Sequence, residues 1–249
     1  MSNIAVETRG AVRIVRLNRP EKKNALTIAM YEDLITAFAD ANSDDSVRAL
    51  VVLGTNGVFS AGNDIGDFIQ NPPTDETSAV FRVLVSISTF PKPVVAGVDG
   101  AAVGLGTTML QHFDLVFATK EARFRMPFVP LGLVPEGASS VLLPMFVGLH
   151  RASEWLLLGD VFTAEEAHRA GFINHIVEST ELEAKVLQTA EALAARPVQA
   201  VRLAKRLLRE PLAQAVADAI AREGALFIER LRSPEAMEAL MAFATRGKK

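Results

Sequence analysis

The 249-residue chain contains no cysteine. This absence excludes disulfide bonds, thiolate catalysis and every metal site that has a cysteine ligand. It fits a reducing compartment. The first ten residues carry Glu7 and Arg9 and no apolar core, which indicates neither a signal peptide nor an arginine-rich transit peptide. We therefore predict a cytoplasmic protein.

Long apolar runs and an excess of basic residues are also missing. No uninterrupted apolar segment approaches the roughly 20 residues of a membrane span, so we predict a soluble protein without membrane contact. The chain has 26 basic and 29 acidic side chains, a formal net charge of −3. Such a balance gives no broad basic field, and we expect no nucleic-acid partner.

Several common catalytic motifs are absent as well. The chain has no phosphate-binding loop of the G-x-x-x-x-G-K-[ST] type, no G-x-S-x-G turn and no H-E-x-x-H zinc helix. The segment Gly104–Met109 begins like a dinucleotide fingerprint, but Met109 stands where that fingerprint needs a small residue. The four histidines lack the close spacing of zinc ligands, so we predict no metal site and interpret each as a surface or hydrogen-bonded core residue. They are His112, His150, His168 and His175.

The chain does contain enough apolar side chains for a large core, since 49% of its residues are hydrophobic. Residues 49–54, 93–98 and 115–118 are short, continuously apolar and bounded by turn residues, which predicts strands buried on both faces. Val12–Leu17 alternates apolar and basic residues and predicts a half-exposed strand. A helix capped by Thr27 is expected to follow. Strands separated by helical stretches predict an α/β fold with a largely parallel sheet.

The composition changes near residue 180. From about Glu181 the chain is rich in alanine, and apolar residues recur at helical spacing. One such stripe is Leu182, Val186, Ala190 and Leu193; another is Leu212, Val216, Ile220, Phe227 and Leu231. We predict a core domain over residues 1–180 and an all-helical region over residues 181–249.

Two glycine-bearing segments are the most informative feature. Phe59–Ile65 and Gly100–Gly106 each have the pattern of a strand end, a tight turn and a helix, a geometry that points backbone N–H groups at one anion. About thirty residues later Glu136, beside Gly137, is a lone carboxylate in an apolar stretch. Two N–H donors and one base together would form a proton-transfer site.

Each of these residues also has a structural interpretation when taken alone. Asn63 suits a turn, and Asp64 suits the cap of the next helix. Leu105 suits the core, and Glu136 suits the first turn of a helix, where an acid is favoured by the helix dipole.

Five motifs taken together resemble the crotonase superfamily in order and spacing. They are Leu17–Pro20 with Asn24–Leu26, Phe59–Asp64, Pro91–Ala96 with Asp99–Gly100, Asp114–Leu115, and Thr163–Ala167. The resemblance covers residues 1 to about 245. It implies a crotonase-like spiral of ββα units, C-terminal helices that join subunits into homotrimers or homohexamers, and an acyl-CoA thioester as ligand.

The resemblance also implies an oxyanion hole. By position, its backbone N–H donors are those of Asn63 and Leu105. The positions that match CoA or substrate contacts are Lys22 (or Lys23), Ala25, Ala61, Gly62, Asp64, Ile65, Gly104 and Phe128. We expect no cofactor beyond the CoA of the substrate.

The choice of reaction depends on which carboxylates are present. Enoyl-CoA hydratases of this family use two glutamates, and this chain has Thr108 and Phe128 at those positions, neither of which is a usable base. Residues 126–140 instead resemble the peroxisomal-type enoyl-CoA isomerases, in which a glutamate at the position of Glu136 is the acid/base. An apolar wall that includes Leu133 and Val134 is expected to raise the pKa of Glu136.

We therefore predict isomerisation of 3-enoyl-CoA to 2-enoyl-CoA in fatty-acid or related acyl-CoA degradation. Glu136 takes a proton from C2 and returns it to C4. The alternatives are an enoyl-CoA hydratase or another crotonase-type acyl-CoA lyase and, in a different class, a non-catalytic acyl-CoA-binding module.

Overall fold

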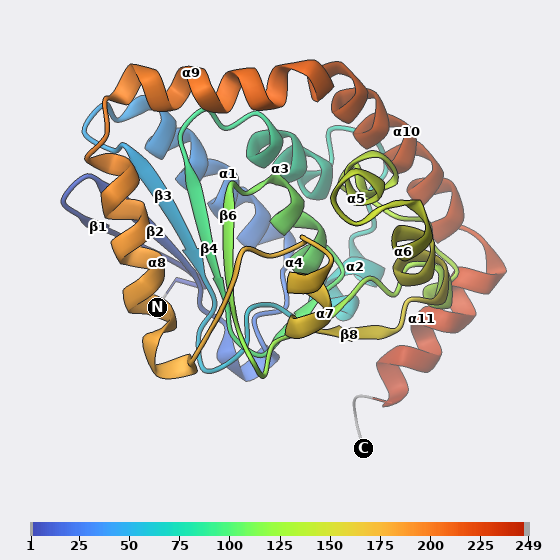
Figure 1. Ribbon diagram of the computed structural model, residues 1–249. Helices are drawn as coiled ribbons and strands as arrows, with labels where there is room; N and C mark the ends of the chain where they lie inside the picture. Colours follow the sequence, from blue (N-terminus) through green and yellow to red (C-terminus); the bar gives the residue numbers. More distant parts are fainter. Residues whose placement is uncertain (1, 247–249) are drawn as a thin grey trace.

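A six-stranded sheet forms the centre of the computed structural model, which describes residues 2–246 (Figure 1). Its strands follow the order β1 (Ile4–Arg9), β2 (Val12–Leu17), β3 (Ala49–Leu53), β4 (Val94–Val98), β6 (Leu115–Thr119) and β9 (His175–Val177). β1 pairs with β2 antiparallel, and all the other neighbours in this sheet are parallel. The predicted α/β fold with a largely parallel sheet is confirmed.

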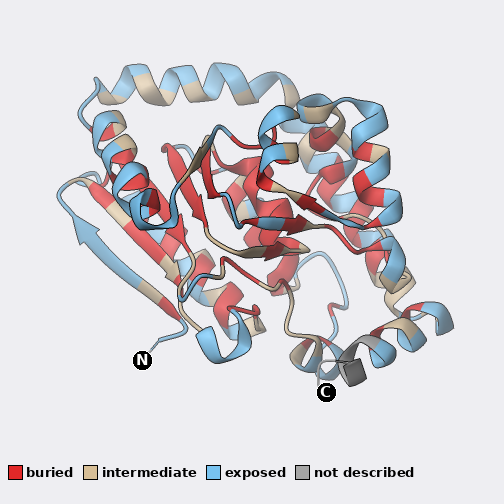
Figure 2. Cartoon of the chain, turned by 60° about the horizontal axis from the view of Figure 1, so that its bottom comes forward, coloured by how far each residue is buried: buried red, intermediate tan, exposed pale blue. Residues whose placement is uncertain are grey.

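Helices cover both faces of this sheet. Every residue of β3 and β4 is buried, as the continuously apolar runs predicted, and these strands are red in Figure 2. One face packs against α8 (Ser179–Ala194), and the other against α1 (Ile28–Ser43) and α3 (Ala79–Ser88). The α1 helix begins where predicted, because the Thr27 side chain accepts a hydrogen bond from the N–H of Met30.

The prediction of a half-exposed strand at residues 12–17 is wrong. The four apolar residues of β2 are buried, two on each face of the sheet. Its arginines remain half-buried at the margins, where Arg13 pairs with Asp44 and Arg16 pairs with Glu183 of α8. The basic residues therefore mark ion pairs with the covering elements rather than a solvent face.

A smaller sheet of three short strands carries part of the site. Its order is β5 (Ala101–Val103), β7 (Arg123–Arg125) and β8 (Val161–Thr163). Strand β5 follows β4 almost directly and β7 follows β6, so the chain alternates between the two sheets before it enters a helix. This alternation is the repeating ββα arrangement that the family resemblance implied. Strands of three residues are too short for a periodic apolar pattern to reveal them.

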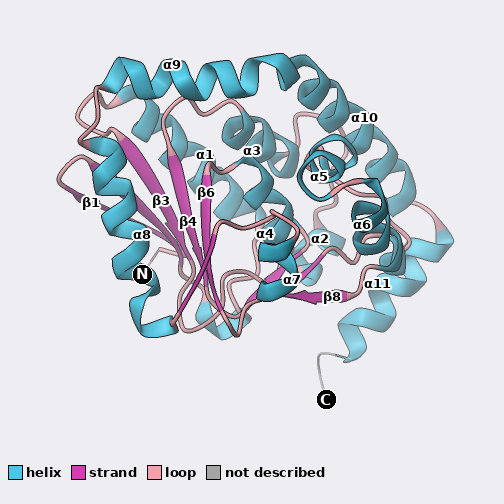
Figure 3. Ribbon diagram, in the orientation of Figure 1, coloured by secondary structure: helices cyan, strands magenta, loops and turns pink. Residues whose placement is uncertain are grey.

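The remaining helices lie around this core, and Figure 3 shows that the last part of the chain is helical. They are α2 (Ile65–Gln70), α4 (Leu105–Thr108), α5 (Ser139–Val147), α6 (Leu149–Ser153), α7 (Ala164–Arg169), α9 (Val198–Arg209), α10 (Ala213–Leu231) and α11 (Pro234–Arg246). Short 3-10 or π-helical turns are η1 (Pro20–Lys22), η2 (Met109–His112), η3 (Val129–Leu131), η4 (Glu154–Leu158) and η5 (Glu210–Leu212). Throughout residues 2–246, every helix is too short or too polar to cross a bilayer.

The start of the C-terminal helical region agrees with the predicted change near residue 180, because α8 begins at Ser179. This helix nevertheless packs on the central sheet, whereas α10 and α11 lie beside the loops that carry the site. Residue 1 and residues 247–249, the outer ends of the two predicted domains, lie outside the described part. The division into two domains stays a prediction.

Candidate active site

The two glycine-bearing segments are in direct contact. A Cβ on Gly62, whose φ is +83°, would lie 2.6 Å from the carbonyl oxygen of Val103. A Cβ on Gly106 would lie 2.9 Å from the Cβ of Ser60. Because only glycine allows these approaches, the turn before α2 and the start of α4 can lie side by side. The predicted juxtaposition of the two segments is therefore present.

The backbone directs the N–H of Asn63 away from Leu26, with which Asn63 forms an isolated parallel bridge. Leu26 donates to the carbonyl of Gly62 at 2.8 Å and accepts from the N–H of Asp64 at 2.8 Å. Alternate backbone groups of an extended segment point to opposite sides, so the N–H of Asn63 faces away from Leu26. Leu105 is the first residue of α4, where the N–H has no partner within the helix.

A cavity lies where these two residues meet. Its lining is mostly apolar and includes seven of the predicted site residues, namely Ala61, Gly62, Asn63, Ile65, Gly104, Leu105 and Phe128. The rest of the lining comes from Phe68, Val103, Pro127, Leu131, Leu133, Phe227 and Leu240. An apolar pocket with a few polar backbone groups is the usual form of a small-molecule site.

The other predicted ligand contacts lie outside this lining. Lys22 and Lys23 are exposed at the turn η1. The guanidinium of Arg19 bridges two of the others, because its Nη1 donates to the carbonyl of Ala25 at 3.0 Å and to Asp64 Oδ2 at 2.7 Å. A single arginine thus joins the 19–25 loop to the turn that presents Asn63.

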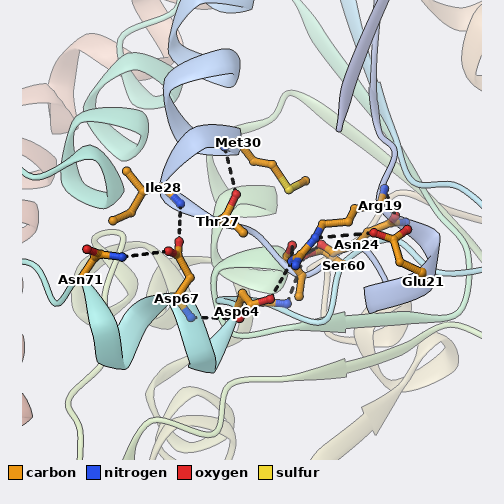
Figure 4. A network of polar contacts seen from close by, with 12 residues as sticks. Arg19, Glu21, Asn24, Thr27, Ile28, Met30, Ser60, Asp64, Asp67 and Asn71 are labelled. Atoms are coloured by element: carbon orange, nitrogen blue, oxygen red, sulfur yellow. Dashed lines mark hydrogen bonds and ion pairs between the residues drawn. The ribbon is translucent and has the colours of Figure 1, made fainter. Parts of the chain in front are cut away.

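Figure 4 shows how this loop network is built. Asp64 is also the cap of α2, since its Oδ1 accepts from the N–H of Asp67 at 3.1 Å, and Asp67 in turn accepts from the N–H of Ile28 at 2.8 Å. Burial opposes ionisation of Asp64, but the hydrogen bonds from Arg19 and Asp67 outweigh it and lower the pKa of Asp64. The structural interpretation of Asp64 as a helix cap is therefore correct.

Glu136 is almost completely enclosed, with 1% of its surface exposed. Its Oε1 accepts a long hydrogen bond of 3.4 Å from Thr108 Oγ1, and within the described residues its Oε2 has no hydrogen-bond partner. Burial, followed by the charge of Glu223, raises the pKa of Glu136 from 4.5 to about 8. The predicted rise in pKa is found. The interpretation of Glu136 as a first-turn helix acid is wrong, because α5 begins only at Ser139.

Glu223 is a buried carboxylate that the sequence analysis missed. It comes from α10 and accepts hydrogen bonds from the N–H of Ala138 and from the N–H and hydroxyl of Ser140. Burial raises the pKa of Glu223, and these three hydrogen bonds oppose that rise. A signal was available, because residue 223 falls between Ile220 and Phe227 on a predicted apolar helix stripe.

Tyr31 is a second residue that the sequence analysis missed. Its hydroxyl donates to Asn63 Oδ1 at 2.5 Å, and only 1% of the residue is exposed. Burial, with further contributions from Glu136, Asp67 and Asp64, raises the pKa of Tyr31, so the phenol remains a donor. It is the only tyrosine of the chain, beside the apolar stripe of the predicted helix.

His112 has the structural role that the sequence indicated. Its Nε2 lies 2.8 Å from the carbonyl oxygen of Gly137, and burial lowers the pKa of His112 to about 4. The neutral ring thus supports the residue that follows Glu136. Glu136 is not among the residues that line the cavity; Thr108 connects it to that lining, because its Oγ1 lies 3.4 Å from the carbonyl oxygen of Leu105 and 3.4 Å from Glu136 Oε1. Together these residues provide two backbone N–H groups and one carboxylate with an oxygen that no described residue contacts by hydrogen bond, a set suited to moving a proton next to a carbonyl.

Comparison with known proteins adds a family. Residues 7–249 match the family described as "Enoyl-CoA hydratase/isomerase". The chain is 35% identical to "Enoyl-CoA delta isomerase 2" of Rattus norvegicus over 98% of its own length, and it spans 63% of the length of that relative. It is similar to the "Structure of Pseudomonas aeruginosa OdaA", with a TM-score of 0.95 and 43% identity over 98% of this chain and 99% of that one.

A relative with another described activity and a second isomerase match at slightly lower identity. The chain is 31% identical to "4-chlorobenzoyl coenzyme A dehalogenase-2" of Arthrobacter sp, over 98% of this chain and 91% of that protein. It is 33% identical to "Enoyl-CoA delta isomerase 3, peroxisomal" of Mus musculus, over 98% of this chain and 78% of that protein. Overall similarity therefore leaves the choice of reaction to the residues of the site.

Proposed function

The chain belongs to the enoyl-CoA hydratase/isomerase family, and from this premise we propose that it converts 3-enoyl-CoA thioesters to 2-enoyl-CoA thioesters. Family membership also confirms the crotonase-like fold. The observation that carries the proposal is the environment of Glu136, a buried carboxylate with an unpartnered oxygen and a high affinity for protons.

The proposed reaction needs one base that is used twice. Ionised Glu136 takes the C2 proton, and the charge that develops moves onto the thioester oxygen. There the N–H groups of Asn63 and Leu105 stabilise it, each donor contributing about 2.7–4 kcal/mol. The acid form of Glu136 then delivers the proton to C4. A carboxyl group with a pKa near neutrality suits both transfers.

The same surroundings argue against hydration. A hydratase needs a second carboxylate to handle water, and Thr108 and Phe128 occupy the positions that the resemblance assigns to its glutamates. Glu223 is the other buried carboxylate near Glu136, and three hydrogen bonds already engage its oxygens. It is therefore poorly suited to bind a nucleophilic water.

Substrate recognition is part of the proposal. The CoA moiety would lie along the 22–25 loop and the turn at residues 61–65, where Lys22 and Lys23 offer exposed cations to its phosphates. The acyl chain would enter the apolar cavity beyond Asn63 and Leu105. In this binding mode five of the predicted contact residues shape the surface mainly through their backbone: Ala25, Gly62, Asp64, Ile65 and Gly104.

The test is an assay of the purified protein with a 3-enoyl-CoA, following formation of the conjugated 2-enoyl thioester. We expect Glu136→Gln to lower kcat by at least about 10³-fold while a CoA ester still binds, since the change removes the base but little contact area. The exposed Glu229 on α10 gives a matched control, and Glu229→Gln should keep full activity.

The alternatives have distinct outcomes in the same experiment. Turnover that survives in Glu136→Gln would contradict the assignment of the base. Hydration of 2-enoyl-CoA without isomerisation would identify a hydratase. Binding of a CoA ester without turnover of either substrate would identify a non-catalytic module.

A further inference from the structure

Glu223 lies directly behind the turn that carries Glu136. Its oxygens accept from the N–H of Ala138 at 2.7 Å, the N–H of Ser140 at 2.9 Å and the hydroxyl of Ser140 at 2.5 Å. Ala138 has a φ of +60°, a conformation that is unfavourable for a residue with a side chain. The carboxylate of α10 therefore holds a strained turn in the segment that begins with Glu136.

The two buried carboxylates differ in what surrounds them. Three donors converge on Glu223, whereas Glu136 has one long hydrogen bond from Thr108 and an oxygen that no described residue contacts by hydrogen bond. Hydrogen bonds to an ionised carboxylate stabilise it, and a buried carboxyl without them keeps its proton. Burial raises the pKa of both groups, but three hydrogen bonds oppose the rise at Glu223, so at neutral pH the negative charge of the pair belongs on Glu223 and the proton on Glu136.

The other polar groups around the pair do not alter this assignment. Tyr31 of α1 interacts with Glu136 as a neutral phenol, and His112 of η2 contacts Gly137 as a neutral ring. Arg222 lies next to Glu223 on α10 and favours its ionised form. The charge of Glu223 also disfavours ionisation of Glu136, second only to burial.

We propose that Glu223 is a positioning residue of this site: as the ionised member of the pair at neutral pH it fixes the turn at residues 137–140 and keeps a negative charge beside Glu136. This inference rests on the proposed isomerisation. It assigns a role to the C-terminal helical region that goes beyond packing, because a residue of α10 would add to the effect of burial on the proton affinity of the reacting group. A stronger base takes the C2 proton more readily once it is ionised.

The first experiment is the pH profile of kcat/KM for the isomerisation. Activity should rise with pH as Glu136 ionises, with a midpoint near 8 in the unaltered protein. In Glu223→Gln the midpoint should fall by about one pH unit, because a like charge is removed, and the plateau value of kcat should fall about tenfold. Glu229→Gln, the same change on an exposed turn of α10, should leave the profile unchanged.

A merely structural role for Glu223 predicts a different result. Loosening the turn would lower kcat at every pH without moving the midpoint, and that outcome would overturn the inference. Ser140→Ala separates the two effects, since it removes one donor and keeps the charge. Its midpoint should stay within a few tenths of a pH unit of that of the unaltered protein.

A second measurement needs neither turnover nor a variant at position 223. The infrared carbonyl band of a buried protonated carboxyl group should persist at pH 7 in the unaltered protein and should be absent in Glu136→Gln. A band that survives this substitution would place the proton on Glu223 and overturn the inference. A band that behaves as expected in a protein without isomerase activity would overturn the proposed reaction but not the distribution of charge.

Discussion

The hydroxyl of Tyr31 fixes the orientation of the Asn63 side chain through a hydrogen bond to its Oδ1. The hydrogen bond joins α1 to the turn before α2, and the phenol is buried, so water cannot easily replace it. Asn63 contributes its backbone N–H to the proposed oxyanion hole, and the precision of such a donor matters because misplacement by a fraction of an ångström weakens the charge stabilisation. In the proposed reaction Tyr31 would act through Asn63.

Replacing Tyr31 by phenylalanine tests this role, because the ring and its packing remain. We expect Tyr31→Phe to lower kcat and kcat/KM together by about tenfold, as for an interaction made in the transition state. The free energy of unfolding should fall by about 1 kcal/mol through loss of one hydrogen bond. Steady-state kinetics and urea unfolding measure the two effects. An unchanged kcat would show that the contact only stabilises the fold.

The site residues that were proposed from the sequence and those that were missed differ in how far along the chain the residues that identify them lie. Asn63, Leu105 and Glu136 were assigned through the family resemblance, and the motifs that carry it, glycine turns and an isolated carboxylate in an apolar stretch, are local patterns. Glu223 was missed because its partner Ala138 is 85 residues away, and only folding brings α10 to the turn. The local pattern predicts a donor or a base, whereas its electrostatic surroundings come from distant elements.

Among the elements, the approach of the 59–65 turn to the start of α4 is the feature that creates the site. Gly62 lies where the carbonyl of Val103 leaves no room for a side chain. Gly57 also has a positive φ, at +68°, but an added Cβ there would meet nothing within 4 Å. Alanine substitutions at Gly62 and Gly57 can therefore be compared to separate the effect of backbone strain from the effect of a steric clash.

We expect Gly62→Ala to destabilise the protein by at least about 2 kcal/mol and to abolish isomerisation, since strain and a clash both push the two segments apart. Gly57→Ala should cost about 1 kcal/mol from its backbone conformation alone and should keep activity. Denaturant unfolding and the enoyl-CoA assay provide the comparison. Equal losses of stability in the two variants would mean that the contact with Val103 is unimportant.

The elements themselves were predicted best where long apolar segments repeat. The buried strands at residues 94–98 and 115–119 and the cap at Thr27 follow from local patterns. The burial of β2 did not follow, because the helix that covers it, α8, comes from a part of the chain that was treated as a separate region. Its arginines pair with acids on other elements, which a strand pattern cannot reveal.

The whole molecule presents apolar surface on its C-terminal helices. Leu207 and Leu208 of α9 are 66% and 78% exposed, and Met237 and Met241 of α11 are also exposed. Such surface suits the association into a homotrimer or homohexamer that the family resemblance implies, and the oligomeric state stays a prediction. So does the cytoplasmic location, since one relative in Mus musculus is described as peroxisomal.

Buried ionisable groups make the stability of the whole molecule depend on pH in two opposing ways. Between its ordinary value of 6.5 and its folded value of about 4, His112 is charged only in the unfolded chain, so stability increases with pH over that range. Between 4.5 and about 8, Glu136 is protonated only in the folded chain, so its contribution to stability is lost as pH rises. Each effect amounts to about 1.4 kcal/mol per pH unit.

These two contributions predict the shape of the stability curve. They cancel between about pH 4.5 and 6.5, where the raised pKa of Glu223 adds a decrease of its own, so the free energy of unfolding should decrease slightly there and should fall further from pH 6.5 to 8. In Glu136→Gln the second contribution disappears, and stability should instead increase up to pH 6.5 and then remain level. Urea unfolding at half-unit steps of pH measures both curves. Parallel curves for the two proteins would mean that Glu136 does not hold its proton in the folded state, and the base of the proposed reaction would then lack its raised affinity.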